Sequence, residues 1–447
     1  MTFWQREPFD SLISEGHFNV VDAGPLHSPI RSFTLRRNDK LQLVLTTVGD
    51  GDAIANELLR QTGLHNNAST VQLQSIFGTS VTLVGVQPLS VHTFTNRETR
   101  REELREEASV HRLSSILDPA TNADYTIDWL ENVFNDYYLW PDLIVDNEET
   151  IKTRTFGRGE GALVITNTST TGSHGRRGID LSIGGINIKL CSSKYAKQDG
   201  QLKPGFILYS GRPDEDTRRK IRTVLSFSLG QYFVHLGHST YSSNWRLLSF
   251  EAISAYSIDK KAFDLITMPP TLLGERAHNE LSHAPVSRLS NALYSHYDEL
   301  NFGGLSWAYW HAICAPLHIA AVHFGAAIEA LERKYVEAHS QDFSTTILTR
   351  PAWQNFAGQV DNLIGNTDIA DEAKSALRAN LGLINQVTRR AITEDVLCRT
   401  GVVLGDDERR AWPNALSKII YSDFAAPEIL LEMKNWGQRR FIPSASP

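Results

Sequence analysis

The chain has 447 residues, of which 41% are hydrophobic and 21% are charged. This composition is typical of a globular protein with two or three domains, and it excludes extensive disorder. The formal net charge of −7 excludes a global basic surface, so a nucleic-acid partner would need a local basic patch or an active site.

The cysteines and the N-terminus indicate a cytoplasmic protein. Cys191, Cys314 and Cys398 are odd in number and far apart, and they match neither a disulfide framework nor a metal-ligand spacing. The opening residues, MTFWQREPFDSL, lack the basic start and apolar core of a signal peptide. We therefore expect a reducing compartment, with no metal and no cofactor.

Short alternating runs rich in β-branched residues dominate residues 1–210, and Gly, Asn and Asp separate them as turns require. They predict an N-terminal β-rich domain over 1–210, built as an antiparallel sandwich or open barrel. The predicted strands are 17–21, 31–37, 41–47, 70–77, 79–86, 162–168, 179–191 and 205–211.

Two charged segments interrupt this pattern. Residues 97–107, RETRREELREE, contain four arginines and five glutamates and predict a solvated helix or linker. Residues 170–178, TTGSHGRRG, predict a hairpin loop. In that loop His174, Arg176 and Arg177 are candidate nucleic-acid-binding residues, because small basic loop tips often contact phosphates. The alternative is a plain exposed turn.

Residues 211–268 form a mixed connecting segment, with helical spacing over 214–234 and a strand over 245–258. The Met-Pro-Pro run at 268–270 breaks both patterns and predicts a domain boundary. A helical domain is expected over 269–447. Its predicted helices are 286–300, 305–338, 351–364, 369–385, 387–399, 406–421 and 425–435.

The stretch from Trp307 to His339 predicts one long, mostly buried helix, and its charged interruptions make it a core helix, not a membrane span. At 100° per residue, His311, His318 and Glu329 share one face, and His323 points about 120° away from it. These residues lie too far apart along a helix to bind one metal ion without further ligands. Either they pair with a basic partner on another helix, or they are core-edge residues bonded to neighbours.

Four segments together resemble the ApeA-type bacterial anti-phage proteins, in which a β-rich N-terminal domain precedes a helical HEPN domain. Beyond these four segments, the resemblance extends over nearly the whole chain. It implies an α+β fold class. The segments are SEGHFNVVDAGPLHSPIRSFTL (14–35), IDWLENVFNDYYLWPD (127–142), VLSFSLGQYFVHLGHSTYSSNW (224–245) and WAYWHAICAPLHIAAVHFGAAIEALERKY (307–335).

The resemblance implies a defence protein that acts by abortive infection. Its β domain would sense a phage-derived trigger, and its helical domain would pair as a homodimer and cleave RNA, such as tRNA, without a metal. HEPN nucleases use an arginine, often followed by a polar residue, and a histidine four to six residues further on. The histidine shuttles a proton and the arginine stabilises the charged transition state. Glu329 matches the acidic residue that orients the arginine.

The chain departs from this motif at its expected place, just after residues 404–412. Arg409 and Arg410 are present there, but no histidine follows His339 anywhere in the chain. The catalytic pair is lost, or His311 or His318 serves from across the bundle, or the C-terminal sequence is atypical of its relatives.

The sequence therefore leaves three hypotheses for the function. The first is a HEPN endoribonuclease of this defence family, with Glu329, Arg409, Arg410, His318 and His311 as candidate catalytic residues. The second is a catalytically inactive HEPN protein that senses or neutralises a partner by binding. The third is a ligand-binding β domain on a structural helical dimerisation module.

Overall fold

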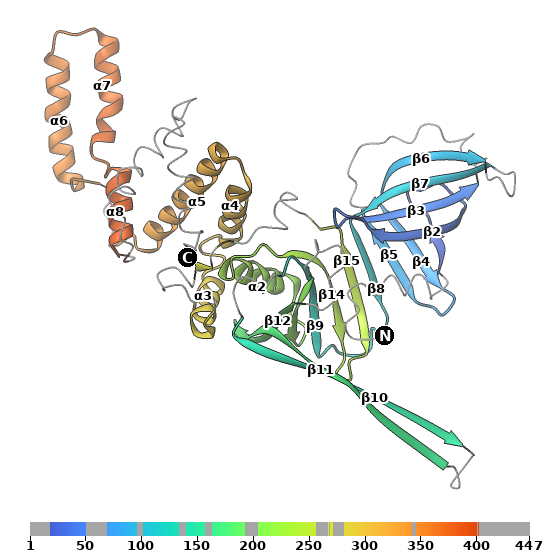
Figure 1. Cartoon of the computed structure of the whole chain (residues 1–447). Coiled ribbons are helices and arrows are strands. Elements are labelled where there is room, and N and C mark those ends of the chain that lie inside the picture. The colour runs from blue at the N-terminus through green and yellow to red at the C-terminus, as the bar shows by residue number, and fades with distance from the viewer. Residues whose placement is uncertain are drawn as a thin grey trace, which may run out of the picture. The chain divides into compact units, whose positions relative to one another are not determined.

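The computed structural model describes residues 18–50, 69–95, 102–133, 140–156, 163–192, 204–255, 267, 269–270, 281–341, 346–399 and 401. It divides into two compact units, Met1–Ser295 and His296–Pro447. The described part of the first unit is β-rich and that of the second is helical (Figure 1), which confirms the expected α+β class. Among the described residues, no helix is long and apolar enough to cross a membrane.

The first unit contains two antiparallel sheets. The larger has the strand order β1-β4-β5-β8-β15-β14-β9-β13-β12-β11-β10, and the smaller has the order β2-β3-β7-β6. The strands are β1 (Phe18–Asp22), β2 (Ile30–Arg37), β3 (Leu43–Asp50), β4 (Thr70–Ser75), β5 (Ser80–Val84), β6 (Gln87–Thr95), β7 (Glu102–Val110), β8 (Arg112–Ile116), β9 (Tyr125–Glu131), β10 (Asp142–Phe156), β11 (Leu163–Ile183), β12 (Ile186–Ser192), β13 (Gly205–Ser210), β14 (Val234–Tyr241) and β15 (Leu247–Ile253).

Period-two alternation builds the core of this unit. Leu45 of β3, Leu73 of β4 and Leu113 of β8 belong to one buried cluster that joins the smaller sheet to the β1 end of the larger one. Two antiparallel sheets packed on a shared core fit the sandwich among the two predicted alternatives, sandwich or open barrel. Each predicted strand overlaps an observed one.

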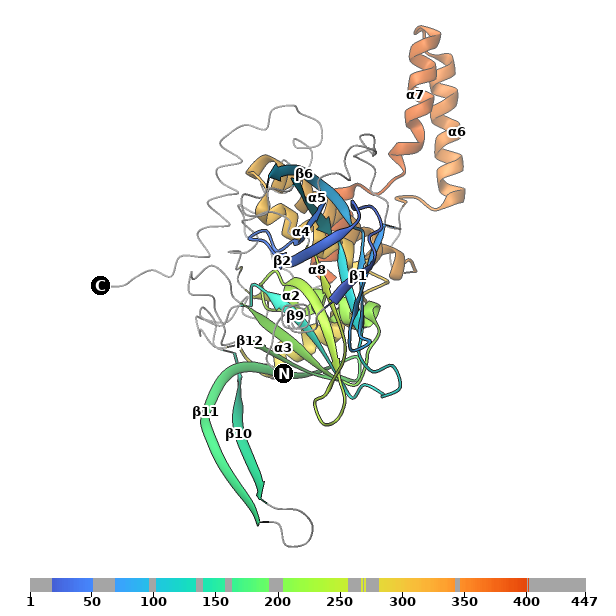
Figure 2. The same ribbon diagram turned by 90° about the vertical axis from the view of Figure 1, so that its right-hand side faces the viewer.

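One face of the larger sheet is covered by the helices α2 (Glu215–Ser228) and α3 (His283–Ser295) (Figures 1 and 2). Helix α2 begins at Asp214, whose side chain accepts a hydrogen bond from the Thr217 N–H at 2.7 Å. Helix α3 packs against α2 and β11. The compact units therefore divide after Ser295, whereas the sequence placed the boundary at residues 268–270.

The predicted solvated helix or linker at 97–107 is wrong for the residues the structure describes there, because residues 102–110 form β7. Alternation buries Leu104, Glu106 and Ala108 in this strand despite its high charge. The Glu106 carboxylate accepts a hydrogen bond from the His27 backbone N–H at 2.9 Å, so this charged residue is part of the interior.

The predicted hairpin loop at 170–178 is also wrong, because these residues lie inside β11. The register pairs His174 with Asp146, Arg176 with Ile144 and Arg177 with Leu143 of β10. Strands β10 and β11 continue past the sheet as a two-stranded ribbon (Figures 1 and 2). Residues 170–178 therefore have the composition of a turn but form part of an extended strand. Contact of His174, Arg176 and Arg177 with nucleic acid stays a prediction.

The second unit contains the helices α4 (Phe302–Cys314), α5 (Leu317–Ala338), α6 (Arg350–Asn366), α7 (Asp371–Ile384) and α8 (Arg389–Arg399). The last three confirm the predictions for 351–364, 369–385 and 387–399. The predicted helices at 406–421 and 425–435 lie outside the described residues. Helices α6 and α7 pack against each other, and α5 packs against α8.

The single helix predicted over 305–338 is wrong, because the chain breaks at Ala315 and Pro316. Proline has no N–H and disfavours helical geometry in the residue before it. Ala315 is accordingly extended, with ψ 157°, and Pro316 caps the next helix. Helices α4 and α5 therefore form a hairpin.

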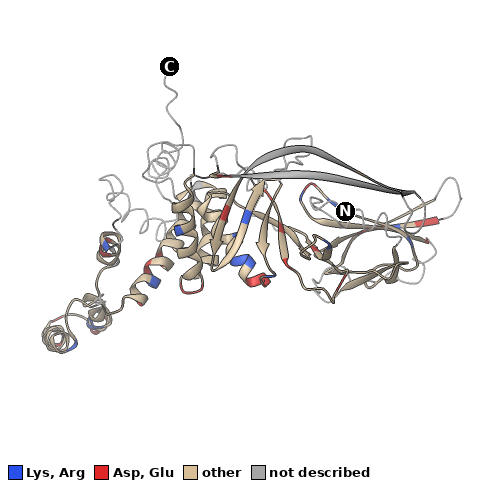
Figure 3. Ribbon diagram, turned by 90° about the horizontal axis from the view of Figure 1, so that it is seen from below, with Lys and Arg blue, Asp and Glu red and all other residues tan. Residues whose placement is uncertain are grey.

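Lysine, arginine, aspartate and glutamate residues are distributed over both the helices and the sheets of the described chain (Figure 3).

Candidate functional site

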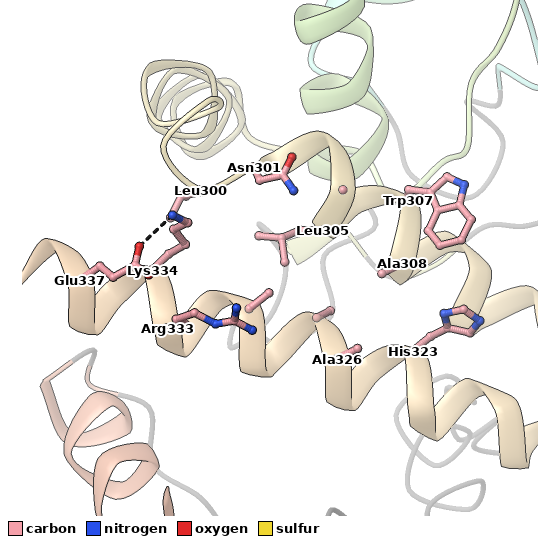
Figure 4. Close-up of a pocket in the computed structure, with 13 residues that line it drawn as sticks. Leu300, Asn301, Leu305, Trp307, Ala308, His323, Ala326, Arg333, Lys334 and Glu337 are labelled. Atoms are coloured by element: carbon pink, nitrogen blue, oxygen red, sulfur yellow. Dashed lines mark hydrogen bonds and ion pairs between the residues drawn. The ribbon is translucent and has the colours of Figure 1, made fainter. Parts of the chain in front are cut away.

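A pocket of about 420 Å³ lies between α4 and α5 (Figure 4). Small side chains line its centre, and this lets the two helices pack closely. Aromatic, imidazole and charged groups stand at its ends. The lining residues are Leu300, Asn301, Gly304, Leu305, Trp307, Ala308, His323, Ala326, Ala327, Ala330, Arg333, Lys334 and Glu337.

At one end of the pocket, two imidazoles and an indole form a cluster. The ring centroids of Trp307 and His311 are 3.8 Å apart, and those of Trp307 and His323 are 5.9 Å apart. The His311 and His323 centroids are 5.8 Å apart. Burial and the neighbouring charge of His323 lower the pKa of His311, so His311 is neutral near pH 7. This end joins a neutral imidazole, a second imidazole and an indole that is 55% exposed.

At the other end of the pocket, α5 presents Arg333, Lys334 and Glu337 (Figure 4). The Lys334 ammonium donates a hydrogen bond to the Glu337 carboxylate at 2.8 Å. This hydrogen bond and the charges of Lys334 and Arg333 lower the pKa of Glu337. Two cations face one carboxylate, so this end carries a net positive charge.

The hairpin changes which predicted residues meet. Because the chain reverses at Pro316, His311 faces His323 of the opposite helix, and it no longer shares a helical face with His318 and Glu329. His318 lies in the first turn of α5, and its side chain is outside the described part. Glu329 is half-buried on α5 and is not one of the residues lining the pocket. Arg409 and Arg410 lie outside the described residues.

The carboxylate that α5 buries most deeply is Glu332, which is 7% exposed. Its Oε1 accepts a hydrogen bond from the Thr393 hydroxyl of α8 at 2.6 Å. The sequence resemblance indicates Glu329, whereas this buried carboxylate, Glu332, lies three residues further along. Since Thr393 is 61 residues away, only the packing of α5 on α8 identifies this pair.

A second cluster of charged residues lies in the β-rich unit, where α2 covers the sheet. The Asp128 carboxylate of β9 is fully buried and accepts hydrogen bonds from Arg218 Nη1 at 2.5 Å and Tyr209 OH at 2.9 Å. Arg222 Nη1 also donates to it. Arg218 and Arg222 lie one turn apart on α2, so both guanidinium groups reach the same carboxylate.

Glu215 completes this cluster from the solvent side. Arg218 Nη2 donates to one carboxylate oxygen of Glu215 at 2.6 Å, and Arg222 Nη2 donates to the other at 2.5 Å. Each guanidinium therefore lies between a buried carboxylate, Asp128, and an exposed one. We refer to Asp128, Glu215, Arg218 and Arg222 as the α2 charge cluster.

The α2 charge cluster sets the pKa values of its members and neighbours. Burial alone would raise the pKa of Asp128, but Arg222, His235 and Arg218 outweigh it and hold that pKa well below its usual range. Burial and the charge of Arg218 lower the pKa of His238 to about 4. The carboxylate is therefore ionised and His238 is neutral near pH 7.

Comparison with protein-family models, with curated proteins and with solved structures finds no match to this chain. Within the described residues, no group of three or more His, Cys, Asp or Glu side chains is placed to hold a metal ion.

Proposed function

We propose that this protein is a bacterial anti-phage defence protein of the ApeA type, acting in the cytoplasm, whose HEPN-like helical unit acts on RNA at the α4–α5 pocket. The observation that carries this proposal is the pairing of His311 with His323 beside the exposed Trp307. The β-rich unit would sense the infection signal, a role that rests on the sequence resemblance.

The pocket supports metal-independent RNA cleavage by acid–base chemistry. His311, neutral near pH 7, takes the proton from a ribose 2′-hydroxyl as its oxygen attacks the adjacent phosphorus. His323, in its protonated form, donates a proton to the 5′-oxygen as the bond between that oxygen and phosphorus breaks. The products are a 2′,3′-cyclic phosphate and a free 5′-hydroxyl. Trp307 offers its exposed face to a base, as aromatic residues do in single-strand binding sites.

The basic end of the pocket supports the binding of a neighbouring phosphate. Arg333 lies ten residues after His323 on α5, which places them about 15 Å apart along the helix axis. A nucleic-acid strand laid along the hairpin would meet the imidazoles at one end and Arg333 and Lys334 at the other.

The distance between Arg333 and His323 along α5 favours a second candidate function. This is an inactive HEPN protein that binds RNA or a partner without cleavage. An arginine that stabilises a transition state must reach the phosphate that the histidine attacks. Arg333 is too far from His323 to do so. The pair Arg333 and His339, which has the spacing of the family motif, does not meet either, because His339 caps α5 and stacks on Tyr335.

An RNA-cleavage assay tests both candidates. Full-length protein is incubated with total tRNA, with and without EDTA, beside the variants His311→Asn, His323→Asn and Glu329→Ala. Cleavage that resists EDTA and is lost in both histidine variants supports the nuclease. Binding of tRNA without cleavage, also in the presence of lysate from infected cells, supports the second candidate.

We also propose that the protein pairs as a homodimer through the helical unit. Helices α6 and α7 expose large apolar side chains, among them Phe356, Leu363, Leu377, Leu383 and Ile384. Exposed apolar surfaces of this kind usually mark protein interfaces. Pairing of two copies through this surface would remove it from water.

A further inference from the structure

The α2 charge cluster has one member that is held far more loosely than the rest. Asp128 is fully buried and Arg218 is 4% exposed, whereas Glu215 is 54% exposed. Water can solvate the Glu215 carboxylate when it leaves the cluster, whereas the other three side chains have little access to water. The two buried Nη2 atoms then need another acceptor, because a buried donor without a partner is costly.

Departure of Glu215 would expose two guanidinium groups that are already held in place. Asp128 fixes both Nη1 atoms, and both Nη2 atoms would lose their acceptor. The charge of two arginines and one carboxylate is then +1. A guanidinium pair held in this way matches the oxygens of a phosphate group, to which arginine binds in a bidentate manner.

Three buried nitrogen atoms beside the cluster have no hydrogen-bond partner among the described residues. They are Arg218 Nε, His235 Nε2 and His238 Nδ1. His235 Nε2 lies 3.7 Å from Asp128, and His238 Nδ1 lies 3.8 Å from Glu251, both too long for a hydrogen bond. Buried polar atoms without partners are rare and often mark the place of a bound ion or ligand.

The start of α2 adds to the attraction of a negative group. Glu215 is the first residue of the helix, where the backbone N–H groups and the helix dipole favour an anion. The Glu215 carboxylate is the anion that now occupies this place between the two arginines.

We propose that Arg218 and Arg222 form a binding site for the phosphate group of a small ligand, and that Glu215 closes this site when the ligand is absent. The phosphate replaces the Glu215 carboxylate and accepts hydrogen bonds from both Nη2 atoms. A phosphate has more oxygen atoms than a carboxylate, so it can also accept a hydrogen bond from a buried nitrogen atom such as Arg218 Nε. This site lies in the β-rich unit and does not depend on RNA cleavage by the helical unit.

The test measures the binding of inorganic phosphate to the full-length protein by isothermal titration calorimetry at constant ionic strength. Glu215→Gln weakens the competing carboxylate and keeps its size. If Glu215 occupies the site nine-tenths of the time, its removal tightens phosphate binding about tenfold. Glu215→Ala is the second variant, and it should bind phosphate at least as tightly as Glu215→Gln.

Asp216→Asn is the matched control. Asp216 is 56% exposed on the same helix turn and pairs with Arg219 and Lys220, so its removal adds the same charge beside different cations. The proposal expects this variant to bind phosphate as the unchanged protein does. Equal binding by the Glu215 and Asp216 variants would overturn it. Acetate binding to Glu215→Gln as tightly as phosphate would overturn the assignment of a phosphate group.

Discussion

His311 on α4 and His323 on α5 lie with their ring centroids 5.8 Å apart. They meet because Pro316 ends one helix and starts the next, so the chain returns along itself. The hairpin is thus the structural basis for the acid–base pair that we propose at the pocket.

Substitution of either imidazole should abolish RNA cleavage if the pair acts as base and acid. We expect His311→Asn and His323→Asn each to lower the rate by about 10²- to 10⁴-fold, the usual contribution of one positioned proton-transfer group. Rates are measured over pH 5 to 9, where the unchanged protein should give a bell-shaped profile. His339→Asn, on the exposed end of α5, is the control and should retain the rate. Full activity in either pocket variant would contradict the assignment.

Loss of the buried carboxylate should destabilise the β-rich unit strongly. Asp128→Asn leaves Arg218 and Arg222 without their buried counter-charge, and we expect a cost of about 3 to 5 kcal/mol in the free energy of unfolding. Urea denaturation followed by circular dichroism measures this loss. Asp216→Asn, an exposed change on α2, should leave the unfolding midpoint nearly unchanged. A midpoint for Asp128→Asn close to that of the control would show that the buried pair contributes little.

Stability should fall in mild acid because of His238. Its pKa is about 4 in the folded protein and near 6.5 when the chain is unfolded, so the unfolded state binds a proton first as the pH falls. Its contribution is complete above pH 6.5 and is lost between pH 6.5 and 4, on the order of 3 kcal/mol in total. Urea denaturation at pH 7, 5.5 and 4.5 measures the slope, which His238→Gln should reduce. An unchanged slope in this variant would assign the acid sensitivity to other groups.

The link between α5 and α8 should depend on the hydrogen bond from Thr393 to Glu332. Thr393→Val removes one donor from a buried carboxylate, and we expect a loss of about 1 to 3 kcal/mol. Thermal unfolding measures the change. Thr367→Val is the comparison, because the Thr367 hydroxyl donates to the Leu363 carbonyl at the exposed end of α6. Equal effects of the two substitutions would mean that burial of Glu332 adds nothing.

Pairing of two copies should depend on the apolar surface of α6. Leu363 is 67% exposed, and Leu363→Lys would place a charge within the proposed interface. We expect light scattering to give the mass of a dimer for the unchanged protein and of a monomer for this variant. Gln354→Lys, which points about 180° away from Leu363 around the axis of α6, should remain a dimer. A monomer for the unchanged protein at micromolar concentration would refute the pairing.

The strands and the later helices were predictable because their signal is local. Alternation identifies β4 and β5, and helical spacing identifies α6 and α7. The same rule would have identified β7, where Leu104, Glu106 and Ala108 alternate, had the charge of the segment not been weighed more heavily. The break at Pro316 was also readable, since proline within an apolar helix pattern indicates a helix end.

The α2 charge cluster was not predictable in the same way, because its residues come from distant parts of the chain. Asp128 lies 90 residues before Arg218, and no local pattern relates them. A partial signal exists on α2, where Arg218 and Arg222 fall on or beside the stripe that carries Ile221 and Leu225. A charged residue at such a position indicates a buried partner, but only the fold identifies which one.

The hydrogen bonds from Arg218 and Arg222 to Asp128 also constrain which sequence changes this protein can accept. Arg218 and Arg222 both reach Asp128 only because four positions separate them, which is one helical turn. Substitutions at positions 219 to 221 keep the angle between the two arginines around the helix axis, although the buried Ile221 must stay apolar. Gain or loss of a single codon between the two arginines would rotate one guanidinium by about 100° away from the sheet. Natural relatives of this chain should therefore differ in side chains within this turn and agree in its length.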